Sequence, residues 1–569
     1  MEISNIWIVK VADSGFRHFV NFVSKTLIGL HEPRLPSTGA GIARAEMEAN
    51  LRKRLLSSFK LQGFSLKSDA LSYLVDVLTP YSYSTELDDI LDRVIEAAQQ
   101  QDLKSAILGR DIIEKAVDEC NEASDNDTEK ALVVIDAFSI PAFTYNSDKK
   151  KFFPKKGSSN LYGGAADKAA LWKERYSIVH QATLRHELFA VPASGTNPKH
   201  QNSRFQLKTI EYLLSTSGSS TKVLVLGMLV QIVEGKYHLE DPSGTVEVDI
   251  SSTQFQNGLF TENSLVLAEG IYEDGVFHSS AIGFPPPEPA SRSRAHHGNT
   301  NFFGGPLTTC AQTSGKLQAM EKQHFHEMFV FLADVFLDDE HVMSKLKMLF
   351  EGYSKSPPIA FVFMGNFSSA PFGSARNENM ARGFDALADV ITAFPPLLEK
   401  SQFLFVPGSA DPSPGNILPQ PPLPSSITQG LADKVPSAVF CTNPCRIQFC
   451  TQEIVVFRED LLNKLCRNYV KFPNASVDMS QHLVKTLLSQ AHLCPLPLHV
   501  RPVYWQCDHA LRLYPLPDLI VLGDYSAPFT VTEAGCTIVN TGSFPHNGFE
   551  FKAYFTGTRK VDDSALPDT

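Results

Sequence analysis

The sequence lacks an apolar run long enough to cross a membrane. Its richest run, residues 223–233, is interrupted by Gly227 and Gln231 and falls short of the roughly 18 apolar residues of a spanning helix. Cysteines are also few: there are nine in 569 residues, and only Cys120 precedes residue 310. Such sparse thiols do not build a disulfide scaffold, and the N-terminus has no apolar signal-peptide core. We therefore expect a protein of a reducing, intracellular compartment.

Positive charge is also in deficit. Lys and Arg number 51 against 62 Asp and Glu, which gives a net charge of −11. A protein that coats DNA by itself needs clustered cations, so this balance argues against that class, although a local basic patch stays compatible with it. The 20% charged and 43% hydrophobic residues exclude wholesale disorder, collagen and coiled coil. At about 150 residues per domain, the length predicts three to four domains.

The N-terminal quarter divides into an extension and a helical domain. Residues 1–46 show no clear pattern and are interpreted as an extension of unknown role, with a transit segment as the less favoured alternative. Residues 47–122 carry apolar side chains at helical spacing and predict four helices. Gly63 and Pro80 end the first two, and Thr85 to Asp88 is typical of a helix N-cap.

The middle of the chain is predicted as a barrel between two connectors. Residues 123–180 read as a linker, because five lysines lie between Lys149 and Lys156; a solvated connector is the default interpretation and DNA contact the minority one. Residues 181–290 predict an OB-fold from short strands separated by turns. The expected strands are 205–214, 223–233, 237–239, 246–250, 264–272 and 276–283. Residues 291–325 read as a second connector.

Residues 326–569 alternate short apolar runs with helical segments. The runs are 328–332, 359–364, 403–406, 438–440, 454–456 and 519–522. Strands buried on both faces have this composition, and helices are expected around 340–350, 380–394 and 458–468. The domain is therefore α/β or α+β with a layered sheet.

Polar segments follow several of these runs, which is where layered α/β domains usually build their chemistry. Their order and spacing resemble the calcineurin-like metallophosphoesterases, whose two-metal site uses carboxylates and histidines. When the sequence is matched to those motifs, Asp334 stands at a ligand position, and Asp411 is a carboxylate displaced from one. The other ligand positions hold Phe336, Asn366, Ser409, Ala410, Asp524 and Ser526. Two adjacent metal ions need several carboxylate and imidazole ligands, so we expect neither metal nor catalysis here.

Other candidate ligands are weak. His324 and His326 precede a buried run rather than follow it, so metal binding there is the minority interpretation. Cys441, Cys445 and Cys450 lack the paired spacing of a zinc site and are read as buried or free thiols. The sequence has no P-loop, dinucleotide-binding glycine fingerprint or Gly-x-Ser-x-Gly elbow.

Five strings resemble the B-subunits of replicative DNA polymerases, and specifically those of DNA polymerase epsilon. They are Phe205 to Glu211, Leu239 to Thr245, Asn301 to Pro306, Thr442 to Gln448 and Phe457 to Asp460. The resemblance covers residue 47 to the end. It implies a multidomain α+β protein with an N-terminal helical domain similar to the lid of AAA+ ATPases, an OB-fold β-barrel, and a calcineurin-like phosphoesterase α/β sandwich that lacks metal ligands.

The resemblance also implies a function. The expected protein is a nuclear, non-catalytic accessory subunit of the DNA polymerase epsilon complex, without cofactor. It would scaffold the catalytic subunit through that subunit's cysteine-rich C-terminal region, and its N-terminal helical domain would contact the replicative helicase assembly. DNA contact would be indirect or weak, and no membrane is involved.

Two alternatives stay open at this point. One is an active metallophosphoesterase or nuclease with an atypical site, and the other is a single-stranded DNA-binding OB protein. The barrel strands carry Tyr237, Phe277 and few cations, which favours an OB-fold used for packing over one used for stacking on bases. The apolar strands 223–233 and 264–272 also need more cover than a five-stranded barrel provides, and we expect a permanent partner interface to supply it.

Overall fold

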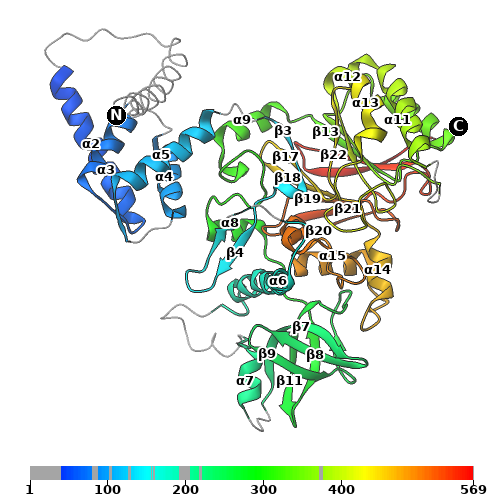
Figure 1. Cartoon of the computed structure of the whole chain (residues 1–569), viewed down its shortest axis with the longest axis horizontal. Helices are drawn as coiled ribbons and strands as arrows, with labels where there is room; N and C mark the ends of the chain where they lie inside the picture. Colours follow the sequence, from blue (N-terminus) through cyan, green and yellow to red (C-terminus); the bar gives the residue numbers. More distant parts are fainter. Residues whose placement is uncertain are drawn as a thin grey trace, which may run out of the picture. The chain divides into compact units, whose positions relative to one another are not determined.

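The computed structural model describes residues 40–567 except 80–86, 102–104, 126–129, 156, 158–159, 191–204, 217–220 and 371–375. The chain divides into two compact units, residues 1–126 and residues 127–569. Figure 1 shows their elements along the colour gradient. Among the described helices, none combines the length and the apolar content that crossing a bilayer requires.

The first unit contains the four predicted helices. They are α2 (Ala40–Leu61), α3 (Ser68–Leu78), α4 (Leu87–Gln100) and α5 (Arg110–Asp125), with a parallel pair of two-residue strands, β1 (Ser65–Leu66) and β2 (Ile107–Leu108). Apolar side chains from all four helices form one buried cluster, including Leu55, Leu74, Leu91 and Ile113. α2 begins at Ala40, inside the segment that the sequence assigned to the extension, and the predicted cap at Thr85 lies outside the described residues.

Five strands close the predicted barrel. They are β7 (Val223–Val233), β8 (Lys236–Asp241), β9 (Gly244–Asp249), β11 (Leu265–Glu273) and β12 (Val276–Gly283), and the pairing of β12 with β9 completes the closure. The short strands β6 (Leu207–Lys208) and β10 (Gln254–Phe255) flank them. The expected strand 205–214 is wrong beyond β6, because Thr209 caps the helix α7 (Ile210–Ser215) by accepting from the Tyr212 backbone N–H.

The outer face of the barrel is covered by the same chain. Met228 and Val230 of β7, with Leu265 of β11, pack against Trp172 and Tyr176, which belong to helix α6 (Ala165–Arg185). The chain itself therefore covers this part of the barrel, for which a partner interface was expected, while Ile232 and Val233 at the end of β7 are 61% and 54% exposed.

The prediction that residues 123–180 form a linker is also wrong. It contains β3 (Leu132–Ile135), which pairs antiparallel with a strand more than 300 residues later. It also contains the hairpin β4 (Phe143–Asn146) with β5 (Lys151–Pro154), and then α6. Lys149, Lys150 and Lys151 lie at the hairpin turn. The Phe152 ring packs against Phe302 and Tyr514, at centroid distances of 5.2 and 5.6 Å. The lysine count predicted a solvated linker, but the partly buried Phe152 between the lysines packs against the rest of the chain and holds the segment in place.

The second predicted connector, 291–325, is structured as well. It contains α8 (Ala290–His297), the 3₁₀ turn η4 (Ala311–Thr313) and α9 (Gly315–Gln323).

Two six-stranded sheets form the C-terminal sandwich. The first sheet has the order β16-β15-β14-β13-β22-β23 and the second β20-β21-β19-β18-β17-β3. The bounds in the first sheet are β13 (Met328–Ala333), β14 (Ala360–Met364), β15 (Gln402–Val406), β16 (Ala438–Phe440), β22 (Glu550–Phe555) and β23 (Lys560–Ala565). In the second they are β17 (Cys445–Phe449), β18 (Gln452–Phe457), β19 (Leu519–Leu522), β20 (Phe529–Glu533) and β21 (Cys536–Asn540).

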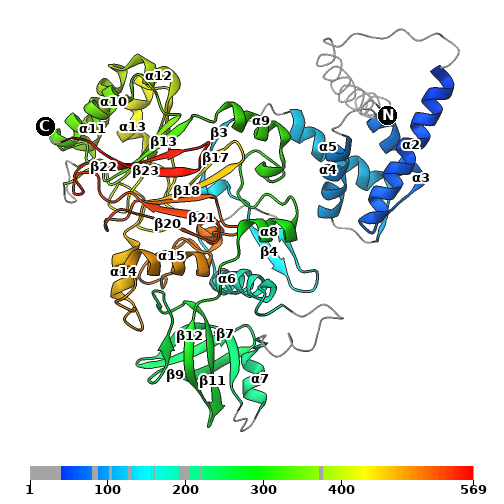
Figure 2. The same cartoon turned by 180° about the vertical axis from the view of Figure 1, so that it is seen from behind.

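Helices cover the outside of this sandwich, as Figure 2 shows from behind. An apolar core between the sheets joins Phe331 and Val362 to Ile454 and Val521. The first sheet packs against α10 (Glu340–Tyr353), α11 (Arg376–Thr392), α12 (Pro395–Lys400) and α13 (Ser425–Lys434). The second packs against α14 (Leu461–Arg467) and α15 (Met479–Gln490). The structure thus confirms the predicted layered α/β arrangement.

Helix α15 also fastens the sandwich to the barrel. His482, Thr486 and Gln490 follow one another at four-residue spacing and so share a helix face. His482 Nδ1 lies 2.8 Å from the Gly258 N, and Thr486 Oγ1 lies 2.9 Å from the Leu259 N. The Gln490 amide makes two 2.8 Å hydrogen bonds, accepting from the Leu265 N and donating to its carbonyl. Buried backbone groups of the barrel therefore depend on side chains of the sandwich.

Candidate functional site

The predicted site lies where parallel strands of both sheets end. Strands β13, β14 and β15 are parallel neighbours in the first sheet, and β18 and β19 are parallel neighbours in the second. Asp334 follows β13, Asn366 comes shortly after β14, Arg458 follows β18 and Asp524 comes shortly after β19. Because the two sheets face each other, these side chains converge on one edge of the sandwich.

The centre of this edge is occupied by a guanidinium group. Arg458 has about 1% of its side chain exposed, and its Nη2 lies 2.7 Å from Asp334 Oδ1, on a carboxylate that is 3% exposed. Its Nη1 lies 2.9 Å from Asp460 Oδ1, and its Nε donates to the Gly365 carbonyl oxygen. Burial alone would lower the pKa of Arg458, but the charges of Asp334 and Asp460 raise it above the usual arginine value. A fixed organic cation thus neutralises the one carboxylate retained from the metal motifs.

Asn366, which follows β14, and the loop after β15 bond to each other instead of to a common ligand. Asn366 Oδ1 accepts from the Ala410 N at 3.0 Å, and the Asn366 N donates to Asp334 Oδ1 at 3.1 Å. Asp411 accepts from the Phe367 N at 2.9 Å and from the Gly408 N at 2.8 Å. Burial raises the pKa of Asp411 to about 6, against the lowering effect of these two donors. Both oxygens of Asp411 are therefore committed to the loop.

The carboxylate of Asp524, which follows β19, likewise accepts its hydrogen bonds from backbone N–H groups. Asp524 Oδ2 accepts from the Leu462 N and Oδ1 from the Ser526 N, both at 2.9 Å. The first of these donors lies in the first turn of α14, where a carboxylate offsets the helix dipole. Phe336, in place of a histidine, turns its ring toward His546 at a centroid distance of 6.0 Å. Ser409 is partly buried and stays without an assigned role.

Of the residues predicted for this edge, the structure joins Asp334, Asn366 and Ala410 by hydrogen bonds. Asp411 bonds to the adjoining Phe367 and Gly408, while Asp524 and Ser526 form a neighbouring cluster. Sequence reasoning missed Arg458 as its central residue. The signal was present in the string Phe457 to Asp460, where a charged triplet follows a buried strand.

The weaker candidate ligands do not form a metal site in the described residues. Cys441, Cys445 and Cys450 are buried free thiols, and burial raises the pKa of Cys450 to about 12. His324 Nδ1 lies 3.6 Å from Glu327 Oε1. Within the described residues no group of three or more His, Cys, Asp or Glu side chains is arranged to hold a metal ion.

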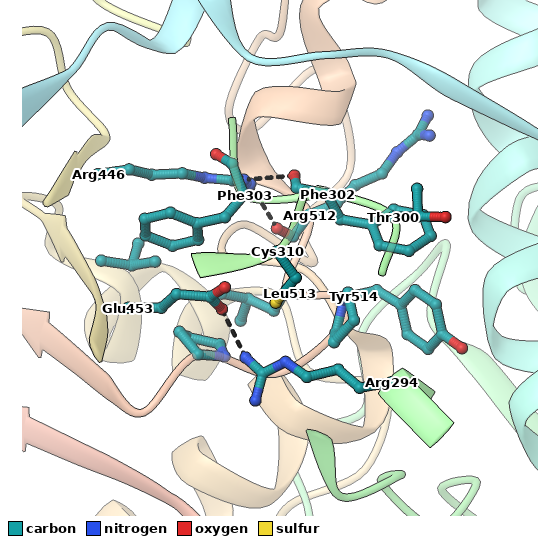
Figure 3. A pocket seen from close by; sticks show the side chains of 13 residues that line it. Arg294, Thr300, Phe302, Phe303, Cys310, Arg446, Glu453, Arg512, Leu513 and Tyr514 are labelled. Carbon is teal, nitrogen blue, oxygen red and sulfur yellow. Dashed lines mark hydrogen bonds and ion pairs between the residues drawn. The ribbon is translucent and has the colours of Figure 1, made fainter. Parts of the chain in front are cut away.

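A second polar centre lies under the connector 291–325. Figure 3 shows Arg446 donating to the Phe302 and Phe303 carbonyls, at 3.1 and 3.0 Å, and Arg294 paired with Glu453 at 2.7 Å. Burial raises the pKa of Glu453 to about 7. The cavity measures about 10 Å³, which holds one water. This centre therefore fastens the connector to the second sheet and does not admit a substrate.

The barrel offers little for base stacking in its strands. Phe277 is fully buried in the barrel core, and Tyr237 packs against the same core. This placement agrees with the interpretation of the barrel as a packing module.

The fold and the site together define a class: a multidomain α/β protein in which a barrel is fastened to a two-sheet sandwich, and the charged side chains at the sandwich edge pair within the chain. Three family models match. Residues 329–531 match the model of the DNA polymerase alpha/epsilon B-subunit, residues 165–286 match "DNA polymerase epsilon subunit 2-like, OB-fold domain", and residues 47–120 match "DNA polymerases epsilon N terminal".

Sequence identity to curated relatives shows which family the chain belongs to. DNA polymerase epsilon subunit 2 of Bos taurus is 50% identical over 520 residues, covering 91% of this chain and 98% of the relative. The Homo sapiens subunit 2 is also 50% identical and also covers 91% and 98%. The DNA polymerase epsilon B-subunit of Saccharomyces cerevisiae is 31% identical, covering 73% of this chain and 72% of the relative. The chain therefore belongs to the family of DNA polymerase epsilon B-subunits, also called subunit 2.

These relatives are named as a second subunit or a B-subunit, and none has a catalytic name. The family predicted from the sequence is thus confirmed, and the chain is a non-catalytic subunit. A solved archaeal phosphodiesterase overlays 42% of this chain and 99% of its own, with 9% identity and a TM-score of 0.24; a similarity that weak supports no functional inference.

Proposed function

We propose that this chain is a nuclear accessory subunit that scaffolds the catalytic subunit of DNA polymerase epsilon and links it to the replicative helicase. The observation that carries the proposal is the 50% identity to subunit 2 relatives over 98% of their length. The test is affinity capture of the tagged full chain from nuclear extract, followed by mass spectrometry. Capture of the polymerase catalytic subunit and of helicase subunits is expected, and their absence would refute the proposal.

The sandwich domain, in this proposal, neither binds stoichiometric metal nor hydrolyses phosphodiesters. The position of Arg458 between Asp334 and Asp460 supports it, because a metal ion there would face a buried positive charge. Elemental analysis after incubation with Mn²⁺, combined with a chromogenic phosphodiester assay, tests it. About two metals per chain, with hydrolysis that falls in Asp334→Ala, would contradict it.

The barrel and sandwich together form the platform for the catalytic subunit's cysteine-rich C-terminal region. The contacts of α15 with the Gly258 to Leu265 segment support this role, because a rigid two-domain surface binds without an ordering penalty. Co-expression of residues 127–569 with that region should give one complex in gel filtration. Elution as two separate species would contradict the platform role.

The first unit, which the resemblance likens to an AAA+ lid, contacts the helicase assembly. Its support is a separate apolar core in a unit that ends at Asn126, so it does not need the rest of the chain for its own packing. Removal of residues 1–126 should preserve polymerase assembly and abolish helicase capture. The truncation has to stop before β3, because a longer deletion removes Leu132–Ile135 from the second sheet and confounds the result. Loss of polymerase assembly, or retained helicase capture, would contradict this division of roles.

A further inference from the structure

The end of α14 and the loop after it present two exposed aromatic rings beside two cations. Tyr469 is 41% exposed and Phe472 is 66% exposed, and their ring centroids lie 5.5 Å apart. Arg467 and Lys471 alternate with them and are also exposed. From residue 464 to 473 the chain contains three cations and no acid. Lys464 is committed to Glu459, which leaves the charges of Arg467 and Lys471 facing solvent.

The loop is held in place from beneath. The Val470 side chain packs against the barrel core, and its N donates to the Phe260 carbonyl at 2.7 Å. Tyr469 forms an isolated bridge with Thr261, and Pro473 is buried. In both overall views α14 and α15 lie between the sheets and the barrel (Figures 1 and 2). The rings are thus presented by a fixed backbone and are not exposed through local disorder.

We propose that residues 467–473 are a contact site for single-stranded nucleic acid. Unpaired bases stack on exposed aromatic rings, and neighbouring cations bind the phosphates that connect those bases. Duplex DNA keeps its bases stacked and cannot use the rings. The site lies outside the barrel strands, so it agrees with the burial of Phe277 and does not depend on the proposed roles in polymerase scaffolding.

The test is fluorescence anisotropy of the full chain with labelled oligo-dT and with a duplex of equal length, at about 50 and 200 mM salt. Phe472→Ala should weaken single-strand binding about 5- to 100-fold, and Phe472→Trp should retain it. Lys471→Ala should reduce the slope of log K against log salt by about 0.7. The matched control is Phe325→Ala, which removes a ring that is 48% exposed elsewhere, and should leave the affinity unchanged.

Each outcome decides the proposal. Tighter binding of single strand than duplex, lost in Phe472→Ala and kept in Phe472→Trp and Phe325→Ala, supports it. No binding at low salt, or equal binding of duplex and single strand, overturns it. Unchanged affinity in Phe472→Ala together with weaker capture of the catalytic subunit overturns it in favour of a protein interface. Equal melting temperatures of the Phe472 variants establish that folding is preserved.

Discussion

The buried pair of Arg458 and Asp334 gives the sharpest stability prediction. Arg458→Met keeps most of the apolar stem volume and removes the charge, so the buried Asp334 carboxyl loses its ion-pair partner and keeps only the Asn366 N as a donor. Breaking a buried pair in this way costs about 3–5 kcal/mol. Asp460 adds little, because its side chain is 34% exposed and water can solvate it.

That loss can be expressed as a melting temperature. At about 2.1 cal/mol/K per residue, a unit the size of residues 127–569 has an unfolding entropy of about 0.9 kcal/mol/K. The midpoint of thermal unfolding should therefore fall by about 3–6 °C in Arg458→Met. Trp172 and Trp505 lie within this unit and report the transition by fluorescence. Arg467→Met, which removes an exposed arginine, is the matched control and should leave the midpoint unchanged.

The double variant Arg458→Met with Asp334→Asn separates a charge effect from a packing effect. Once the carboxylate is neutralised, the loss of the guanidinium leaves no buried charge, so the double variant should be more stable than the sum of the two single effects by about 1–3 kcal/mol. An unchanged midpoint in Arg458→Met, or strictly additive effects in the double variant, would refute the view that Arg458 neutralises this edge.

Three further outcomes are expected. Gln490→Leu leaves both backbone groups of Leu265 without their side-chain partner and should lower the free energy of unfolding by about 2–3 kcal/mol. Gln481→Leu, at an exposed position of the same helix, should not lower it, and equal denaturation curves for the two variants would contradict this. Gly365→Ala places a Cβ 2.0 Å from Asp411 Oδ2 and 2.4 Å from the Gly408 N, so the soluble yield of this variant should collapse. The control Gly352→Ala, whose Cβ meets nothing within 4 Å, should be neutral or slightly stabilising. Asp411 has its pKa raised from 3.8 to about 6, so the carboxyl is more readily protonated in the folded state and its contribution is lost as pH rises through that window. Relative to Asp411→Asn, the free energy of unfolding should fall by about 2 kcal/mol between pH 4 and 7, and a pH-independent difference would contradict the shift.

Uninterrupted apolar runs predicted several strands of the sandwich, whereas two strands that contain a buried cation were missed. β13, β14, β15 and β19 appear as uninterrupted apolar runs because both faces are buried. β17 was missed because Arg446 lies inside it, buried, where three backbone carbonyls accept its hydrogen bonds. β22 was missed for a similar reason: Lys552 is buried there and pairs with Asp563 of β23. A local pattern cannot indicate that a charged residue has a partner elsewhere in the fold.

Long-range pairing also explains the errors in domain organisation. The sequence between the helical unit and the barrel looked like a connector because it is short, basic and rich in turns. Its strand β3 pairs with β17, more than 300 residues later in the chain, and α6 covers part of the outer face of β7. Both contacts join parts of the chain that are distant in sequence, so no periodicity within residues 123–180 could predict them.

For the site, the sequence indicated which ligands are missing but not what replaces them. Asp334 and Arg458 are 124 positions apart, and only the facing of the two sheets brings them together. Each carboxylate at this edge now has an internal donor: Arg458 for Asp334, backbone N–H groups for Asp411, and the first turn of α14 for Asp524. The carboxylates at this edge therefore require positive charge or N–H donors, and the chain supplies both itself. Replacing Phe336 by histidine would add one imidazole without removing the guanidinium, so we expect Phe336→His to bind no Mn²⁺ in elemental analysis unless Arg458 is also replaced; stoichiometric Mn²⁺ in the single variant would contradict this.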